Sequence, residues 1–333
     1  MATPEVGSLD AAENWEAAST KHGLGGMIGG LGHFARKKPL GFVCGTIVLF
    51  FFLIGDVVPE TTNKISRTIG IAESPVPYLA DELTNALPFL YPFAKQNLRS
   101  RLEGASNDHL LGTDALGRDV LSRLFYGARV AVMVAFGATF IAVGLGAIIG
   151  IMSGFYMGWV DKFLMRIVDA FQALPSIVVF IVILGIFTPG LWIIIGVLGA
   201  VLGPTQSRII RGQTLSIMAT PFIEAARVVG ASDRRIMMRY VLPNTFHLII
   251  LNATFLLGLM VLVEATLSFL GYGLPPPFPS WGQMLSLEGR QYMRTAPGLA
   301  IYPGIAIGIL VFSFNLFGDA LRDVLDPRLR GSR

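Results

Sequence analysis

Three side chains that could do chemistry lie close together in the chain: His109, Asp114 and Asp119. Imidazole and carboxylate groups bind metal ions and transfer protons. A metal or catalytic site needs further groups at a fixed spacing, however, and no second histidine lies near His109. The Gly-Thr-Asp turn favours a structural role, in which Thr113 or Asp114 accepts hydrogen bonds from the free N–H groups of the following helix. We therefore predict a helix cap here, and neither a metal site nor a catalytic one.

A second ionisable residue, Glu264, lies inside a long apolar run. An acidic group at the centre of a bilayer costs roughly 2.5 to 3.5 kcal/mol on insertion scales, so we expect Glu264 to face protein or a water-filled path. Two interpretations follow from this. The carboxylate either has a structural hydrogen bond to a neighbouring helix or partner subunit, or it lines a transport pathway.

The composition indicates a membrane protein. Apolar residues make up 53% of the 333 residues and charged residues only 14%, whereas about a quarter of a typical soluble domain is charged. The formal net charge of +4 gives no indication of a nucleic-acid partner. The single cysteine, Cys44, excludes an intrachain disulfide and a cysteine metal site.

Six apolar segments are long enough to cross a bilayer, which takes about 20 residues. In the second, Gly146 and Gly150 form a G-x-x-x-G pattern that favours close helix packing in lipid. The predicted spans are Leu40–Val58, Val130–Met152, Ile167–Phe187, Leu191–Ile210, His247–Leu270 and Leu299–Phe317.

Three details of these spans can be predicted from single residues. Pro175 should bend the third span or free a carbonyl group, because proline interrupts the helical hydrogen bonds. Arg166 and Asp169 are three residues apart on that span and can pair locally. Gln206 and Arg208 end the fourth span, where they should leave the hydrocarbon.

The charges predict the orientation and divide the chain into regions. Of the 26 Lys and Arg residues, 16 fall on the side of the segment between the fourth and fifth spans, and the short loops of the other side carry 2. An excess of Lys and Arg marks the cytoplasmic side. We expect a flexible cytoplasmic tail at 1–38, a first transmembrane helix at 39–58, an extracytoplasmic region at 59–129, a five-helix core at 130–317 and a cytoplasmic C-terminal tail at 318–333.

A charged, helix-forming segment, residues 220–243, separates two of these apolar runs. Phe222–Val229 is predicted to form a short helix, and Gly230 supplies a left-handed exit from it. Ser232 can cap a second short helix. Pro243 should end that helix, because proline cannot continue the hydrogen-bond ladder. The pattern predicts a helix–glycine–helix hairpin beside the membrane.

This hairpin resembles the EAA loop of ABC-importer permeases, except that Tyr240 replaces the usual isoleucine. In that family the loop is a cytoplasmic coupling helix that docks on the ATPase subunit. The resemblance therefore implies an ATPase-coupling role for Glu224, Ala225, Ala226, Gly230, Ser232, Tyr240, Leu242 and Pro243.

A second stretch is similar to the signature of one branch of these permeases, the dipeptide/oligopeptide/nickel transport family. Pro279-Ser280-Trp281-Gly282 and the end of the chain also look like that branch, and Trp281 suits a membrane interface. The signature residues, which the resemblance places outside the cell, are His109, Gly112, Thr113, Asp114, Gly117, Arg118 and Asp119.

The sequence contains no G-x-x-x-x-G-K-[ST] phosphate loop, so we expect no cofactor on this chain and expect ATP and Mg²⁺ on a partner ATPase. A secondary transporter or channel is the alternative, but it would more often show several intramembrane ionisable residues or repeated halves. An intramembrane enzyme would need a second catalytic group.

Together these features predict an all-α, six-span permease of the type I ABC importer kind in a bacterial plasma (inner) membrane. The resemblance implies a homologous second permease subunit, one or two ATP-binding subunits and an extracytoplasmic substrate-binding protein as partners, besides the lipid membrane. It implies transport of dipeptides or oligopeptides, of nickel, or of another small solute.

Overall fold

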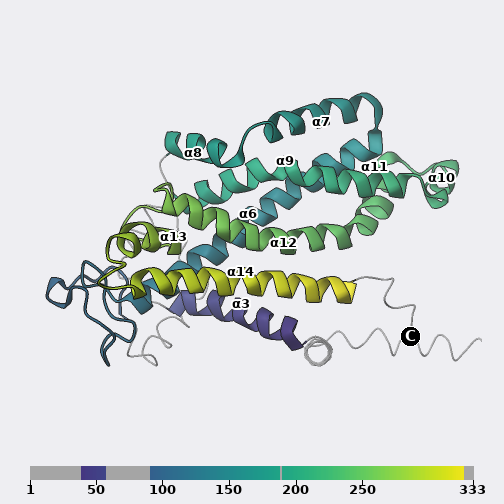
Figure 1. Ribbon diagram of the computed structural model, residues 1–333. Helices are drawn as coiled ribbons and strands as arrows, with labels where there is room; N and C mark the ends of the chain where they lie inside the picture. Colours follow the sequence, from purple (N-terminus) through teal and green to yellow (C-terminus); the bar gives the residue numbers. More distant parts are fainter. Residues whose placement is uncertain (1–38, 58–90, 188–189, 326–333) are drawn as a thin grey trace, which may run out of the picture.

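The computed structural model describes residues 39–57, 91–187 and 190–325, and this part of the chain is helical apart from loops and one isolated bridge between Thr113 and Asp119. The long helices run side by side in an elongated bundle (Figure 1). The helices are α3 (Pro39–Val57), α6 (Val120–Tyr156), α7 (Gly158–Gln172), α8 (Ser176–Ile186), α9 (Leu191–Met218), α10 (Pro221–Val228), α11 (Asp233–Ile236), α12 (Leu242–Phe269), α13 (Trp281–Met284) and α14 (Gly298–Leu325), with a 3₁₀ turn, η1 (Leu98–Ser100), and two π turns, η2 (Met237–Val241) and η3 (Leu285–Gly289).

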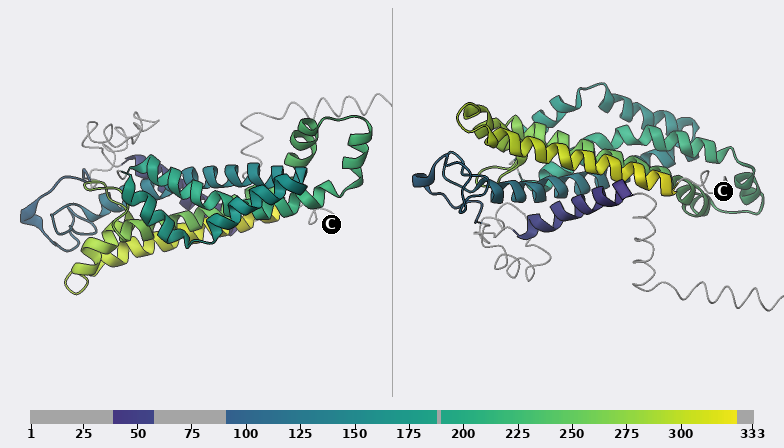
Figure 2. Two further views of the ribbon diagram at one scale, coloured as in Figure 1. Left: turned by 90° about the horizontal axis from the view of Figure 1, so that it is seen from above. Right: turned by 60° about the horizontal axis from the view of Figure 1, so that its bottom comes forward.

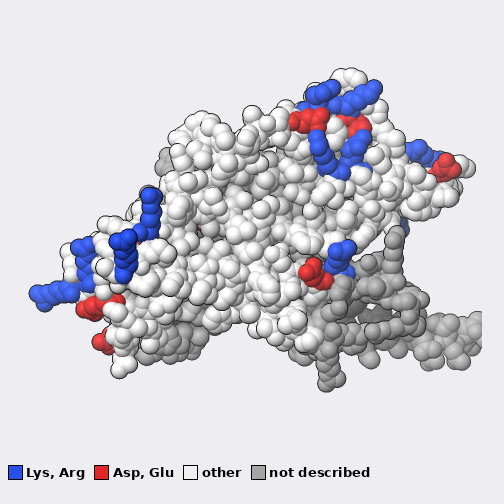
Figure 3. Space-filling model, viewed as in Figure 1, with Lys and Arg blue, Asp and Glu red and all other residues white. Residues whose placement is uncertain are grey.

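The bundle is built on a close pair of helices, α6 and α9, with α12 and α14 beside them and α3 against α14. At one end, called here the hairpin end, α10 and α11 project from the bundle (Figure 2). At the other, called here the loop end, residues 91–119 lie near α13. Charged side chains gather toward these two ends of the face shown in Figure 3, with an uncharged band between them. Such a band suits the hydrocarbon of a membrane.

Glycines allow α6 and α9 to approach closely. A Cβ atom at Gly146 would lie 2.6 Å from the Cβ of Gln206, and one at Gly150 would lie 2.6 Å from the carbonyl oxygen of Ser207. The close packing predicted for Gly146 and Gly150 is thus confirmed. The contact continues to Gly154, whose Cβ would meet Thr214 at 2.7 Å.

The described residues contain four helices long and apolar enough to span a membrane, or five if α7 and α8 together form one broken span. The apolar stretch of α3 that can be assessed, Pro39–Phe51, is shorter. The six-span count therefore stays a prediction, while the all-helical class is confirmed.

The predicted third span is not one helix. It is divided into α7 and α8, which meet at 83° beside Pro175. The bend occurs at the predicted residue, because proline lacks an N–H and keeps the residue before it out of the helical region. The predicted local pairing of Arg166 with Asp169 is wrong, because Asp169 instead accepts a hydrogen bond from Arg208 of α9.

Several helices extend past the predicted spans. Helix α6 begins ten residues before Val130, and α14 continues eight residues past Phe317, so both extend into segments predicted to lie outside the core. Helix α9 continues to Met218, and Gln206 does not emerge from the bundle. It is buried, and its side-chain oxygen accepts a 2.7 Å hydrogen bond from Asn252 of α12. Gln206 stays buried because the neighbouring helix supplies a hydrogen bond to its side chain.

Candidate functional site

The hairpin at 220–243 is the first candidate site. Pro221 occupies the first turn of α10, where its missing N–H has no helical acceptor to lose. Thr220 and Ser232 lie at the N-cap positions of α10 and α11, but neither side chain makes the capping hydrogen bond. Ser232 therefore holds the predicted position without the predicted contact.

Gly230 ends α10 in a tight reversal of the chain. Its φ angle is +79°, a left-handed conformation that glycine adopts without steric cost. The N–H of Gly230 donates to the carbonyl of Arg227 at 2.9 Å, and the N–H of Ala231 donates to that of Ala226 at 3.0 Å. These two bonds form a Schellman cap, which uses carbonyl groups that the last turn of a helix leaves free. The predicted left-handed exit is confirmed.

The predicted end of the second helix at Pro243 is wrong. Helical structure continues without a break from Asp233 to Phe269. The reason is the π turn η2, in which the N–H of Leu242 donates to the carbonyl of Met237, five residues back. This wider turn gives the ring of Pro243 room in a helix where it would otherwise meet the carbonyl four residues before it.

A separate hydrophobic cluster attaches the hairpin to the bundle. Ile223 of α10 and Ile236 of α11 are almost fully buried. They pack with apolar residues near the hairpin ends of α6 and α9 and with the partly buried Ala226, Tyr240 and Leu242; the buried members are Ile151, Phe155, Ile210, Ile217, Met218, Ile223, Ile236 and Val241.

The outer surface of the hairpin is apolar at its tip and charged beside it. Val228 and Val229 are each 87% exposed, and Phe222 is also exposed. Glu224 and Ala225 lie exposed on the same helix. Within the described part of the chain, Glu224 makes no hydrogen bond or ion pair. The hairpin thus presents an unpaired carboxylate and a group of bare apolar side chains outside the bundle.

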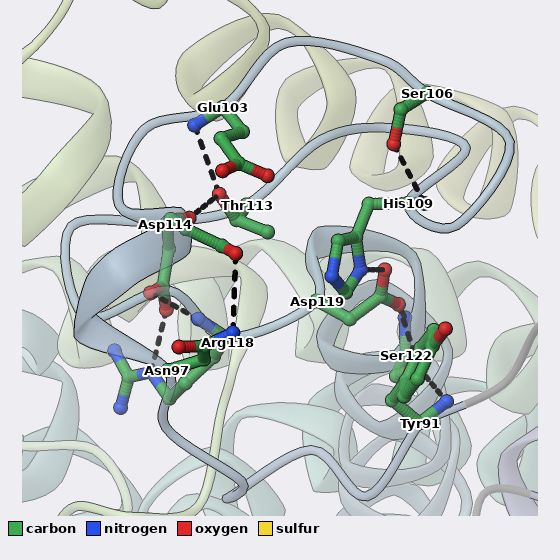
Figure 4. A network of polar contacts seen from close by, with 11 residues as sticks. Tyr91, Asn97, Glu103, Ser106, His109, Thr113, Asp114, Arg118, Asp119 and Ser122 are labelled. Carbon is green, nitrogen blue, oxygen red and sulfur yellow. Dashed lines mark hydrogen bonds and ion pairs between the residues drawn. The ribbon is translucent and has the colours of Figure 1, made fainter.

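At the loop end, the signature residues form a buried polar network (Figure 4). Asp114 accepts hydrogen bonds from the backbone N–H groups of Leu116, at 2.8 Å, and Arg118, at 2.9 Å, and from the Arg118 guanidinium at 2.5 Å. Arg118 also donates to Glu288 at 2.6 Å. Gly112 and Gly117, at the turns of this loop, both have positive φ.

A second arginine completes this group of charges. The Nε atom of Arg123 lies 3.4 Å from Asp114, and its Nε and Nη1 atoms are buried without a hydrogen bond. Burial raises the pKa of the Glu288 carboxyl, and the positive charges of Arg123 and Arg118 oppose that shift. Two carboxylates and two guanidinium groups thus join the signature loop, the start of α6 and η3.

The predicted helix cap is present but formed by another residue. Asp119, not Thr113 or Asp114, is the N-cap of α6, and its carboxylate accepts from both the N–H and the hydroxyl of Ser122 at 2.7 Å. His109 lies 2.9 Å from the other carboxylate oxygen of Asp119. Thr113 instead accepts from the N–H of Glu103 at 2.9 Å. In the described residues no group of three or more His, Cys, Asp or Glu side chains is placed to hold a metal ion.

Glu264 faces protein, as predicted. It is 2% exposed and accepts a 2.6 Å hydrogen bond from the hydroxyl of Ser268. The prediction that Trp281 lies at a membrane interface is wrong. Its side chain is buried inside the bundle, and its indole N–H donates to the carbonyl of Leu124 at 2.8 Å. Gly282 explains its position: α13 approaches α12 so closely that a Cβ there would lie 2.0 Å from the carbonyl oxygen of Ala265.

A long apolar helical bundle with a helical hairpin projecting at one end is typical of a polytopic membrane protein. Residues 146–331 match the model of the family described as "Binding-protein-dependent transport system inner membrane component". The chain belongs to this family, and is a membrane permease subunit of an ATP-driven importer, in which a separate subunit hydrolyses ATP.

Curated relatives agree with this assignment. The chain is 41% identical to a putative peptide transport system permease protein of Brucella suis, over 76% of this chain and 83% of the relative. It is 38% identical to the glutathione transport system permease protein GsiD of Pectobacterium atrosepticum, over 73% and 81%. It is 39% identical to the dipeptide transport system permease protein DppC of Alkalihalophilus pseudofirmus, over 72% and 78%.

The fold is similar to that of a solved transporter. A chain of the inward-facing MetNI methionine ABC transporter superimposes with a TM-score of 0.52 and 21% identity, covering 61% of this chain and 96% of that one. At this level of identity the likeness shows the fold alone, which is that of type I ABC importer permeases.

Sequence reasoning missed the residues that complete the polar groups from distant elements. Glu288 is 170 positions from Arg118, and nothing in its local sequence indicates the pairing. Asp161 and Arg211 also escaped notice, although they form two 2.6 Å hydrogen bonds between α7 and α9. Both residues are charged and lie at the edge of an apolar run. Their position could have indicated an ion pair, because a charged group there needs a partner.

Proposed function

We propose that α10 is the element through which this permease receives force from its ATPase. The observation that carries this is the bare tip of the hairpin. A short helix with exposed Phe222, Val228 and Val229 fits an apolar groove on another protein. Its buried side is fixed to α6 and α9, so a push on α10 acts directly on the bundle.

Charge supports a specific contact at this surface. Glu224 lies in the first turn of α10 and has no partner among the described residues. A carboxylate there is stabilised by the helix dipole by about 0.3 to 1 kcal/mol, and it remains available to a cation of the ATPase. Glu224 and the apolar tip together form the coupling surface, while Ala225 allows close approach.

Two substitutions at exposed glycines test the coupling role. In Gly230→Val a β-branched residue must adopt φ of +79°, at a cost of roughly 1 to 2 kcal/mol, which opens the Schellman cap. Gly212→Val on α9 is the matched control, because a side chain there also meets open space and no positive φ is required.

The readouts are retention of the ATPase during purification and ATP hydrolysed per substrate imported in proteoliposomes. Gly230→Val should insert in the membrane normally but lose ATPase or hydrolyse ATP without uptake, whereas Gly212→Val should behave as wild type. Glu224→Ala and a Val228→Asn, Val229→Asn pair should impair coupling without strain. Wild-type coupling in all three hairpin variants would show that α10 does not receive the ATPase.

The proposed orientation places the hairpin and both termini in the cytoplasm and residues 91–119 outside. The excess of Lys and Arg on the hairpin side supports it. In a Cys44→Ala background, Ala105→Cys should react with an impermeant thiol reagent on intact cells and Ser232→Cys should not, since both positions are exposed. The reverse labelling would overturn the orientation.

The transported solutes are proposed to be small peptides, because the relatives are named for peptide, dipeptide and glutathione transport. The pore would form with a second, homologous permease subunit, and an extracytoplasmic binding protein would deliver the peptide at the loop end. Purification of the intact importer from the bacterial inner membrane, followed by mass spectrometry of bound small molecules, should identify peptides. A metal ion or a sugar in their place would exclude this substrate class.

A further inference from the structure

A charged hollow of about 500 Å³ lies between α7 and α9, toward the hairpin end. Its charges are visible at the upper right of Figure 3. Four cations and two carboxylates line it, together with Met165; the charged residues are Asp161, Lys162, Arg166, Asp169, Arg208 and Arg211. Two positive charges therefore have no matching carboxylate within the hollow.

The two carboxylates are already engaged by the cations of α9. Arg211 makes two 2.6 Å hydrogen bonds to Asp161, and Arg208 donates to Asp169. Lys162 and Arg166 of α7 are both exposed and have no hydrogen bond or ion pair within the described ranges. The ion pairs thus hold α7 against α9, and Lys162 and Arg166 line the hollow without a carboxylate partner.

The surroundings of the hollow are those of a membrane interface. The outer side of α7 carries Trp159 and Phe163, which are 77% and 52% exposed and stacked at 5.6 Å, followed by Ile167 and Phe171. Tryptophan is enriched where lipid tails meet headgroups. A Cβ atom at Gly150 of α6 would lie 3.0 Å from the backbone nitrogen of Arg211, so the hollow lies beside the last two turns of α6.

We propose that this hollow binds the phosphate group of an anionic phospholipid. Lys162 and Arg166 supply the charge, and the apolar side of α7 lies where the acyl chains would pack. Basic pockets between membrane helices at the cytoplasmic surface bind such headgroups. Naming the cytoplasmic leaflet rests on the orientation proposed above, whereas the binding itself does not.

Trp159 provides a local reporter for the test. The importer, purified with its partner subunits, is reconstituted in equimolar phosphatidylcholine and phosphatidylglycerol, with bromine on the acyl chains of one lipid or the other. Bromine quenches tryptophan on contact, and subtraction of the Trp159→Phe protein isolates this residue. Brominated phosphatidylglycerol should quench Trp159 about twofold more strongly than brominated phosphatidylcholine. A twofold ratio corresponds to a preference of about 0.4 kcal/mol for the anionic headgroup, because 1.4 kcal/mol is a factor of ten.

Matched variants and competitors decide the outcome. Lys162→Gln with Arg166→Gln should make the two lipids quench equally, while Arg290→Gln with Arg294→Gln at the loop end should leave the preference intact. Equal quenching in the wild-type protein would overturn the proposal, and would mean that a partner subunit or bulk lipid covers the hollow. Equal quenching in the wild-type protein, together with binding of inorganic phosphate that Lys162→Gln with Arg166→Gln abolishes, would also overturn it, in favour of a free-phosphate site. Uptake is not measured, so a failure of coupling cannot produce either result.

Discussion

The buried charges at the loop end should make Asp114 a sensitive position. Asp114 is fully buried and accepts three hydrogen bonds, two from backbone N–H groups and one from Arg118. In Asp114→Asn the amide oxygen can keep the backbone bonds, but its NH₂ group faces the guanidinium groups of Arg118 and Arg123. Glu288 then remains as the one carboxylate for two buried cations.

The expected loss follows from the uncompensated charge. Removing one partner of a buried ion pair costs about 3 to 5 kcal/mol. The entropy of unfolding is about 2.1 cal/mol/K per residue, or about 0.7 kcal/mol/K for a chain of 333 residues, so a fall in melting temperature of about 4 to 7 °C is expected. Glu103→Gln, which neutralises an exposed carboxylate of the same loop, should leave the melting temperature unchanged.

The single cysteine supplies the assay. Cys44 is 5% exposed in α3, so a fluorogenic maleimide should react with it only as the detergent-solubilised protein unfolds on heating. Adding Arg123→Met to Asp114→Asn removes the surplus cation and should raise the melting temperature again, although Arg123→Met alone lowers it. Additive losses in the double variant would refute the charge-balance reasoning, as would a normal melting temperature for Asp114→Asn.

Two further substitutions should affect stability in the same assay. Gly150→Leu places a side chain against the carbonyl of Ser207 and should cost about 1 to 3 kcal/mol, while Gly144→Leu, which meets open space on the same helix, should not; equal effects would argue against the close approach of α6 and α9. Glu264→Leu removes the acceptor for Ser268 and should cost about 1 to 3 kcal/mol, whereas Glu264→Gln should retain stability. Normal stability with lost uptake in Glu264→Leu would instead favour a pathway role.

Local features of the fold could be predicted from the sequence where one residue decides the backbone. Pro175 marks the break between α7 and α8, and Gly230 marks the left-handed turn of the hairpin. Glu264 was correctly expected to face protein, because lipid offers a carboxylate no hydrogen bond. Each of these predictions rests on a constraint that applies before any tertiary contact forms.

Features that depend on distant contacts could not be predicted in this way. Asp114 has the sequence position of a helix cap, but Arg118 and Arg123 pair with it, Arg118 also donates to Glu288, and Asp119 takes the cap. Asp114, Arg118 and Arg123 are close together in the sequence, whereas Glu288 follows α12 in the chain. A single sequence does not indicate that Glu288 pairs with Arg118.

Pro243 failed as a helix stop for a different reason. The π turn η2 depends on how residues 237–241 pack against the ends of α6 and α9. Local propensity favours termination at proline, and tertiary packing overrides it here.

The unbroken helix from Asp233 to Phe269 has a mechanical consequence. Its 37 residues span about 55 Å at 1.5 Å per residue, and it connects the hairpin at one end to the neighbourhood of α13 at the other. The π turn η2 is its one departure from α-helical geometry in the described chain, so it is the place where bending can be absorbed. A stiff η2 would carry a tilt imposed at the hairpin to the contact between Ala265 and Gly282 at the opposite end, whereas a compliant η2 would confine the same motion to the hairpin.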